Sequence, residues 1–179
     1  MGKQKYTFPG PTCPGCQYHQ SVGDGLVQTR YCNGFDKKRK SKRFKRSDPK
    51  YKPPKWCPRL ISPPVCRVYG FVNEESEFLE WCLNRRDYKP GAYISPSEFR
   101  YRLRCEADLR MTAKQLYDAA QTESVESLFS DAGVDLEYGE VIEIDDGLKP
   151  YYFYYLNYDR LIPMYSFDRS RVRIDAKED

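Results

Sequence analysis

The sequence contains one histidine and no long hydrophobic run, and both shortages restrict what the protein can do. His19 is the only histidine among 179 residues, so reactions that depend on an imidazole base have little support. The longest apolar run covers about six residues, 151–156, whereas a membrane-spanning helix requires roughly 20. No glycine-rich phosphate loop, nucleophile elbow or kinase motif set occurs. We therefore expect a protein that is not an enzyme and has no membrane-spanning segment.

The seven cysteines point to a reducing compartment. Their number is odd, and residues 1–6 contain no apolar secretion signal. Both features argue against a disulfide framework and favour free thiols. We expect a soluble, cytoplasmic protein.

Acidic residues are nearly missing from one segment, and this makes the charge strongly uneven. The net charge of +4 is the sum of +1 over residues 1–36, +10 over 37–55 and −7 over 56–179. Residues 37–55 carry eleven Lys or Arg against one Asp. Like charges at this density, together with three prolines, predict a solvated loop rather than a helix or strand.

A short cysteine motif predicts a structural zinc site. Cys13-Pro14-Gly15-Cys16 places two thiolates on one tight turn, which is a common way to hold a cation. Cys32 and Cys57 complete a tetrahedral set, and Cys66 is an alternative fourth ligand, with His19 a weaker one. The region is poor in aliphatic residues, so a bound Zn²⁺ would replace the core that it lacks. A redox pair at residues 13 and 16, or loop thiols without a role, are the alternatives.

The basic segment predicts contact with nucleic acid or with a nucleoprotein. Each phosphate that a cation neutralises releases counterions, which gives affinity without sequence choice. Interspersed aromatic residues, among them Phe44 and Tyr51, can stack on unpaired bases. An acidic protein surface is the alternative partner. The candidate nucleic-acid-binding residues are Lys37, Lys38, Arg39, Lys40, Lys42, Arg43, Phe44, Lys45, Arg46, Lys50, Lys52 and Lys55.

The remainder predicts an α+β domain, with helices packed on a C-terminal antiparallel β-meander. Helical periodicity and capping signals predict helices over residues 73–86, 97–107, 113–121 and 124–132. In the first, Phe78, Leu79, Cys82 and Leu83 are expected to form the buried face. From residue 138 the period changes to two, which predicts strands over 138–144, 149–156, 162–167 and 171–175. We expect the tyrosine-rich second strand to serve packing rather than base stacking. The expected division is a zinc-binding segment over 1–66, with its basic loop at 37–55, and an α+β domain over 67–179.

One stretch of the second domain is uniformly acidic. Residues 123–146 contain nine acidic residues and no basic ones. Such a surface can imitate nucleic-acid charge on a partner protein, although an ordinary solvated face is the simpler interpretation. The candidate partner surface consists of Glu123, Glu126, Asp131, Asp135, Glu137, Glu140, Glu143, Asp145 and Asp146.

The hairpin around residue 146 also allows a third hypothesis, because some metal-dependent nucleases use only carboxylates and a lysine. Glu140, Glu143, Asp145, Asp146 and Lys149 cluster there. The Asp145-Asp146-Gly147 sequence is explained by its turn, however, and strand alternation puts Glu140 and Glu143 on opposite sides. We therefore do not expect catalysis.

The N-terminal third resembles small zinc-binding accessory proteins of bacteriophages and mobile elements. The similarity is carried by Cys-Pro-Gly-Cys, by Tyr31-Cys32-Asn33-Gly34 and by Trp56-Cys57-Pro58. Those proteins include inhibitors of bacterial defence systems, anti-CRISPR proteins among them, and many act by binding. The resemblance implies a protein that binds an RNA-guided nuclease or its nucleic acid.

Three hypotheses follow. The first is a non-catalytic, zinc-stabilised protein that binds DNA, RNA or a nucleoprotein complex through its basic loop. The second is a phage or mobile-element inhibitor of the anti-CRISPR type, which blocks a nucleic-acid-targeting nuclease by protein–protein contact. The third is a carboxylate metal-dependent nuclease. Base preference, oligomeric state and the choice between Cys57 and Cys66 stay open.

Overall fold

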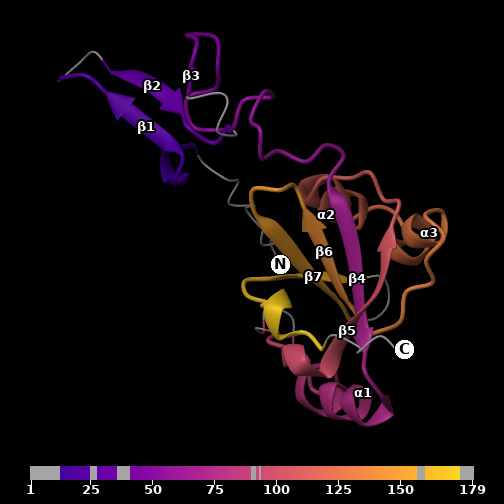
Figure 1. The fold of residues 1–179 in the computed structure, drawn as a ribbon. Helices are drawn as coiled ribbons and strands as arrows, with labels where there is room; N and C mark the ends of the chain where they lie inside the picture. The colour runs from indigo at the N-terminus through magenta and orange to yellow at the C-terminus, as the bar shows by residue number, and fades with distance from the viewer. Residues whose placement is uncertain are drawn as a thin grey trace, which may run out of the picture. The chain divides into compact units, whose positions relative to one another are not determined.

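The computed structural model describes residues 13–24, 28–35, 41–89, 92, 94–156 and 160–173 (Figure 1). The chain divides into two compact units. The first contains Met1–Ile61 and Gly147–Lys149, and the second contains Ser62–Asp146 and Pro150–Asp179. The division therefore falls at residue 61 rather than at the expected 66. Residues 37–40 of the predicted basic loop lie outside the described residues.

The N-terminal unit contains a small antiparallel sheet with the order β1-β2-β3. Its strands are β1 (His19–Val22), β2 (Thr29–Cys32) and β3 (Lys42–Arg43). In the register of the sheet, His19 lies opposite Cys32, and Cys32 lies opposite Lys42. Residues 42 and 43 of the basic segment are therefore part of a sheet rather than a loop.

The core of this unit is small and mainly aromatic. Cys13, Cys32 and Phe44 are buried in it, and the partly buried Phe35 and Trp56 pack against them. Few aliphatic side chains contribute, as the composition predicts. A core of this size gives limited hydrophobic stabilisation, since burial contributes only about 25 cal/mol per Å² of apolar surface.

The second unit is built on a five-stranded antiparallel sheet, which confirms the predicted α+β class. The strand order is β5-β4-β6-β7-β8. The strands are β4 (Val65–Phe71), β5 (Tyr101–Ala107), β6 (Val141–Asp145), β7 (Pro150–Tyr155) and β8 (Leu161–Met164). All five residues of the central strand β6 are buried, so both faces of the sheet are covered there.

The tyrosine-rich strand β7 packs within this core, as expected. Phe153, Tyr154 and Tyr155 are fully buried, and Tyr152 is nearly so. Phe167 contacts the Tyr152 ring with a centroid separation of 5.2 Å. These rings supply the apolar area that the scarce aliphatic residues do not, because each aromatic side chain buries about 150–250 Å².

The first helix forms where it was predicted but presents the opposite face to the core. Helix α1 (Glu74–Glu80) and the π turn η2 (Trp81–Arg85) follow β4 and lie at that end of the sheet (Figure 1). Phe78 and Leu83, expected inside, are 62% and 66% exposed, whereas Ser76 and Glu80 are buried. Glu80 accepts a hydrogen bond from the Asn84 side chain, and Arg100 Nη1 lies 3.6 Å from its other carboxylate oxygen. Burial, the main cause, raises the pKa of this carboxyl group.

The predicted helix at residues 97–107 is wrong. The chain there makes one 3-10 turn, η3 (Glu98–Arg100), and then strand β5. Strand β5 pairs antiparallel with β4: Ala107 lies opposite Cys66 at one end of the ladder, and Tyr101 lies opposite Phe71 at the other. The Tyr101 side chain is fully buried. Long-range pairing with β4 therefore overrides the local capping signal at residues 95–98.

Two short helices agree with their sequence signals. Helix α2 (Ala113–Ala119) begins with a complete capping box between Thr112 and Gln115. Helix α3 (Val125–Ser130) is capped by Ser124 and is followed by Gly133, which has a φ of +76°. The fourth predicted strand is not formed over its described part: 3-10 turn η4 (Arg169–Arg171) occupies its start, and residues 174 and 175 lie outside the described residues. No helix in the described part of the chain is long and apolar enough to cross a membrane.

Candidate metal centre and nucleic-acid interface

Two of the predicted zinc ligands lie on one tight turn. The 3-10 turn η1 (Cys13–Gly15) is closed by the Cys16 N–H, which donates to the Cys13 carbonyl at 3.0 Å. The His19 N–H continues the turn by donating to the Cys16 carbonyl at 2.9 Å. The Cys13 N–H donates to the Tyr51 carbonyl at 2.9 Å, so this turn is tied to the basic segment.

The other two ligands arrive from separate parts of the same unit. Cys32 is buried at the end of β2, and Cys57 is half-buried in a turn closed by its N–H to the Pro54 carbonyl at 2.9 Å. Burial raises the pKa of the Cys13 thiol to about 11, with further increases from Cys57, Cys16 and Cys32 in that order. The thiols whose charges act on Cys13 are thus the other three members of the predicted set.

The donor chemistry of these four residues fits zinc, since four soft thiolates are a common structural Zn²⁺ ligand set. The side chains are not drawn together into a finished coordination sphere. Among the described residues, no three His, Cys, Asp or Glu side chains form a group that could hold a metal ion. Zinc binding therefore remains a proposal, based on the four cysteines of the N-terminal unit, of which Cys13 and Cys32 lie in its core.

Cys66 lies elsewhere. It is 1% exposed within β4, in the sheet of the second unit, and burial raises the pKa of its thiol to about 12. This placement favours Cys57 as the fourth ligand. The His19 ring packs edge-on against Phe44 with centroids 5.8 Å apart. Its Nε2 atom is enclosed and has no hydrogen-bond partner in the described part of the chain.

The basic segment is folded onto the N-terminal sheet over its described part. Arg30 of β2 donates from Nη1 to the Lys50 carbonyl at 2.8 Å, and its guanidinium group lies 4.9 Å from the Phe44 ring centre. Lys42 places its Nζ 4.4 Å from the centre of the Trp56 ring. Two cations therefore help to hold the segment against its own unit.

The predicted nucleic-acid-binding residues divide into four groups. Lys42 is half-buried against the Trp56 ring. Phe44 is 8% exposed and belongs to the core, so it is not available to stack on bases. Lys37, Lys38, Arg39 and Lys40 lie outside the described residues. Exposed cations remain at Arg43, Lys45, Arg46, Lys50, Lys52 and Lys55, with the 59% exposed Tyr51 among them.

The one acid of the segment faces inward. Asp48 accepts hydrogen bonds from the Lys45 N–H at 2.8 Å and from the Trp56 Nε1–H at 3.0 Å. The Lys45 hydrogen bond, ahead of the Trp56 bond and nearby lysines, lowers the pKa of this carboxyl group. Its charge is committed to backbone and indole donors, which leaves the six exposed cations with little compensation from within the segment.

The predicted acidic surface is smaller than the sequence indicated, because three of its nine members are buried. Glu140 and Glu143 are fully buried, and Asp145 is 8% exposed. Glu143 and Asp145 belong to β6, whose central position in a sheet covered on both faces keeps its side chains from the surface. Glu140 directly precedes this strand. Exposed or half-exposed carboxylates remain at Glu123, Glu126, Asp131, Asp135, Glu137 and Asp146.

Two of the buried carboxylates are neutralised by arginines. Glu143 Oε1 accepts from Arg67 Nη1 at 3.0 Å and from Arg169 Nη1 at 2.8 Å. The same two nitrogens lie 3.4 Å and 3.1 Å from Asp145 Oδ2. The Tyr69 hydroxyl donates to Glu143 Oε2. Arg67 and Arg169 thus form ion pairs with Glu143 and Asp145, two of the carboxylates considered in the nuclease hypothesis.

Glu140 lies on the other side of the strand and is less well compensated. Arg104 Nε is 3.1 Å from Oε1 without hydrogen-bonding geometry, and the Glu137 N–H donates to Oε2 at 2.9 Å. Burial outweighs these contacts and raises the pKa of the Glu140 carboxyl group to about 7.

Sequence reasoning missed Arg67, Tyr69 and Arg169 as partners of the acidic hairpin. Arg67 and Tyr69 alternate on β4, and Arg67 lies directly opposite Glu143 in the β4–β6 register. The alternation of side chains with a period of two at residues 65–71 could have predicted strand β4. The ion pair between Arg67 and Glu143, which lie 76 residues apart in the chain, could not be predicted from local sequence.

Comparison of the chain with protein-family models, with curated proteins and with solved structures gives no match.

Proposed function

We propose that the protein is a non-catalytic binding protein whose N-terminal unit holds a structural Zn²⁺ and engages nucleic acid or a nucleoprotein complex through exposed cations. The observation that carries the proposal is the arrangement of residues 43–55. Six exposed Lys or Arg residues lie on a folded scaffold, and the single acid among them turns inward to Trp56 and Lys45.

The scaffold makes these cations a preorganised surface over their described range. Hydrogen bonds from Arg30 to the Lys50 carbonyl and from Cys13 to the Tyr51 carbonyl fix the segment at its middle. Binding a phosphate backbone to a preformed surface loses less conformational entropy than ordering a free loop. The exposed Tyr51, with Lys50 Nζ 5.2 Å from its ring centre, adds a platform for an unpaired base.

The zinc part of the proposal is supported by the composition of the N-terminal core. Its buried members are two of the four proposed ligands and one phenylalanine. Cores of this kind commonly depend on a metal for their stability, and a Zn²⁺ ion would neutralise thiolates that otherwise repel one another. Zinc would supply structure here and no chemistry.

The two alternatives have weaker support. An inhibitor that acts through an acidic surface loses Glu140, Glu143 and Asp145 from that surface. A nuclease that used Glu143 and Asp145 would need to displace Arg67 and Arg169 from them.

The proposal is tested by measuring the affinity of the full-length protein for a fluorescein-labelled single-stranded oligonucleotide by anisotropy. Lys45, Arg46, Lys50 and Lys52 are changed together to Gln; we name this protein the N-unit variant. The matched control removes four exposed cations from the second unit, at Arg86, Lys89, Arg110 and Lys114. Both proteins lose the same charge. We expect the N-unit variant to bind at least tenfold more weakly and the control to stay within about threefold of the wild type.

Equal losses in the two variants would show that net charge alone matters and would overturn the assignment of the surface. Removal of the metal with a strong chelator should lower affinity together with the folded fraction of the N-terminal unit. Binding and folding that both persist after complete chelation would contradict the zinc part of the proposal.

A further inference from the structure

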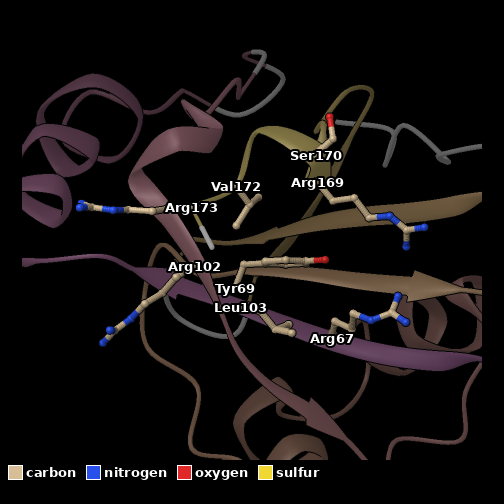
Figure 2. A pocket seen from close by; sticks show the side chains of 8 residues that line it. All are labelled: Arg67, Tyr69, Arg102, Leu103, Arg169, Ser170, Val172 and Arg173. Carbon is tan, nitrogen blue, oxygen red and sulfur yellow. The ribbon is translucent and has the colours of Figure 1, made fainter. Parts of the chain in front are cut away.

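A groove with a volume of about 640 Å³ lies on the second unit, and none of its lining residues is among those that the sequence singled out for binding. It is formed by β4, β5 and the segment that begins with η4. The eight lining residues are Arg67, Tyr69, Arg102, Leu103, Arg169, Ser170, Val172 and Arg173 (Figure 2). Four of them are arginines and none is acidic, but the charges of Arg67 and Arg169 are compensated by Glu106, Glu143 and Asp145. The uncompensated positive charge of the groove therefore includes that of Arg173, which forms no ion pair with a described residue.

The arginines lie in two pairs on either side of an apolar strip. Arg102 and Arg173 project to one side of Tyr69, Leu103 and Val172, whereas Arg67 and Arg169 project to the other (Figure 2). The first pair is positioned by the backbone. Residues 102 and 173 form a parallel β-bridge, and the Arg173 N–H donates to the Tyr101 carbonyl at 2.9 Å.

The second pair is held from below by the buried carboxylates. Arg67 and Arg169 each direct Nη1 toward Glu143 and Asp145, and Arg67 also donates from Nε to Glu106 at 2.9 Å. Within the described residues, neither Arg67 Nη2 nor Arg169 Nη2 has a hydrogen-bond partner, so donors remain for a ligand. The side chains are 22% and 51% exposed.

This second layer distinguishes the groove from an ordinary basic surface. A guanidinium group fixed by a buried carboxylate loses little side-chain entropy when it binds an anion. Arg binds phosphate through paired, charge-assisted hydrogen bonds. Between the two pairs, the Leu103 side chain is 48% exposed and offers an apolar contact for a flat, weakly polar group, whereas Tyr69 and Val172 are buried beneath the groove. Pockets of about 300–1,000 Å³ are typical of small-molecule sites.

We propose that this groove binds a nucleotide, with phosphate held by the arginines and the base against the exposed Leu103 side chain. The nucleotide is either free or part of a single-stranded nucleic acid, since both offer the same phosphate and base. The site is separate from the cationic surface of the N-terminal unit and does not depend on zinc.

The test uses the N-unit variant as its background, so that failure of the proposed function cannot be mistaken for failure of this site. Two probes are titrated into the full-length protein: ADP by isothermal titration calorimetry, and a labelled six-nucleotide single strand by anisotropy. Arg173→Glu is the main variant, because the Arg173 guanidinium contacts no other described residue through a hydrogen bond or ion pair. Arg173→Gln replaces it if charge reversal impairs folding, as judged by circular dichroism.

The control is Arg110→Glu, an exposed arginine outside the groove that pairs only with Asp108 in the described part of the chain. We expect Arg173→Glu to weaken binding at least tenfold and Arg110→Glu to leave it within about twofold. If Arg173→Glu weakens the binding of ADP, a free nucleotide is a sufficient ligand. If Arg173→Glu weakens the binding of the oligonucleotide alone, the ligand is a segment of a polynucleotide. The proposal is overturned if neither ADP nor the oligonucleotide binds, or if Arg173→Glu and Arg110→Glu bind with equal affinity.

Discussion

The Trp56 indole N–H donates a hydrogen bond of 3.0 Å to Asp48 Oδ1 and thereby turns the one acid of the basic segment toward the core. Asp48 Oδ2 accepts from the Lys45 N–H at 2.8 Å, which closes a local turn. The carboxylate therefore stabilises the scaffold while the neighbouring cations point outward. The negative charge of Asp48 therefore faces the core, whereas the positive charges of the neighbouring residues face the solvent and form the proposed binding surface.

Replacement of Asp48 should destabilise the N-terminal unit although it increases the basic character of the segment. Asp48→Ala leaves the half-buried Trp56 N–H and the Lys45 N–H without their acceptor. Because the pKa of Asp48 is lowered in the folded state, its contribution to stability is present above the ordinary value of 3.8 and is lost as pH falls through the folded value. Trp56 fluorescence in a Trp81→Phe background reports on this unit alone, since the chain has two tryptophans.

In that background, Asp48→Ala should lower the midpoint of thermal unfolding at pH 7 more than Asp48→Asn, which keeps one acceptor oxygen. The difference between wild type and Asp48→Ala should shrink below pH 4. Identical midpoints at pH 7 would show that the two hydrogen bonds contribute nothing.

Tyr51 should contribute to single-strand binding through its exposed ring. Its side chain is 59% exposed and is not part of the N-terminal core. Stacking of one base on an aromatic ring contributes about 1–3 kcal/mol, so Tyr51→Ala should weaken single-strand binding by roughly five- to tenfold or more. Tyr51→Phe retains the ring and should bind as the wild type does. Equal losses in the two variants would show that the hydroxyl group, rather than the ring, makes the contact.

Glu140 should make the second unit less stable as pH rises. Burial raises the pKa of its carboxyl group from 4.5 to about 7, so the folded state binds a proton that the unfolded state has released. Stability from this group is therefore fully present below pH 4.5 and declines up to about pH 7, by on the order of 3 kcal/mol. Urea unfolding followed by Trp81 fluorescence, in a Trp56→Phe background, measures the change.

The difference in unfolding free energy between wild type and Glu140→Gln isolates this carboxyl group from other titrating residues. The Gln variant should gain stability relative to wild type from pH 5 to pH 8. A difference that stays constant over this range would mean that Arg104, at 3.1 Å, keeps the pKa of Glu140 at its ordinary value.

The zinc content of two cysteine variants separates the candidates for the fourth ligand. Cys57→Ser should lose the metal and unfold the N-terminal unit, because three thiolates bind Zn²⁺ less tightly than four. Cys66→Ala alters the core of the second unit and should retain about one equivalent of zinc, as the wild type does. Elemental analysis of freshly purified protein provides the values. Zinc loss in Cys66→Ala with retention in Cys57→Ser would reverse the assignment.

Local patterns predicted the parts of the fold that local interactions form. The capping box of Thr112 with Gln115 and the position of Gly133 after α3 both appear in the structure. The two-residue period from residue 138 predicted β6 and the packing of β7. The helix predicted at 97–107 failed because pairing with β4, more than thirty residues away, determines that segment.

Which side of an element faces inward was harder to predict. The spacing of Phe78, Leu79, Cys82 and Leu83 showed that these residues share a helical face, but Ser76 and Glu80 are the buried residues of the helix and that face is largely exposed. The acidic run at 123–146 was likewise predicted as a surface, whereas Arg67 and Arg169 stabilise its central carboxylates inside the fold. Composition could not reveal partners that lie 24 or more residues away in the chain.

The central claim is that the described cations of residues 43–55 form the nucleic-acid-binding surface, and the salt dependence of binding tests it most directly. The logarithm of the association constant for single-stranded DNA changes by about −0.7 per phosphate contact for each unit of log salt concentration. Six contacts would give a slope of about −4 for the wild type, and the N-unit variant should lose about 2.8 of it. The matched control at residues 86, 89, 110 and 114 should keep the wild-type slope. A wild type that does not bind, or an N-unit variant with an unchanged slope, would contradict the account.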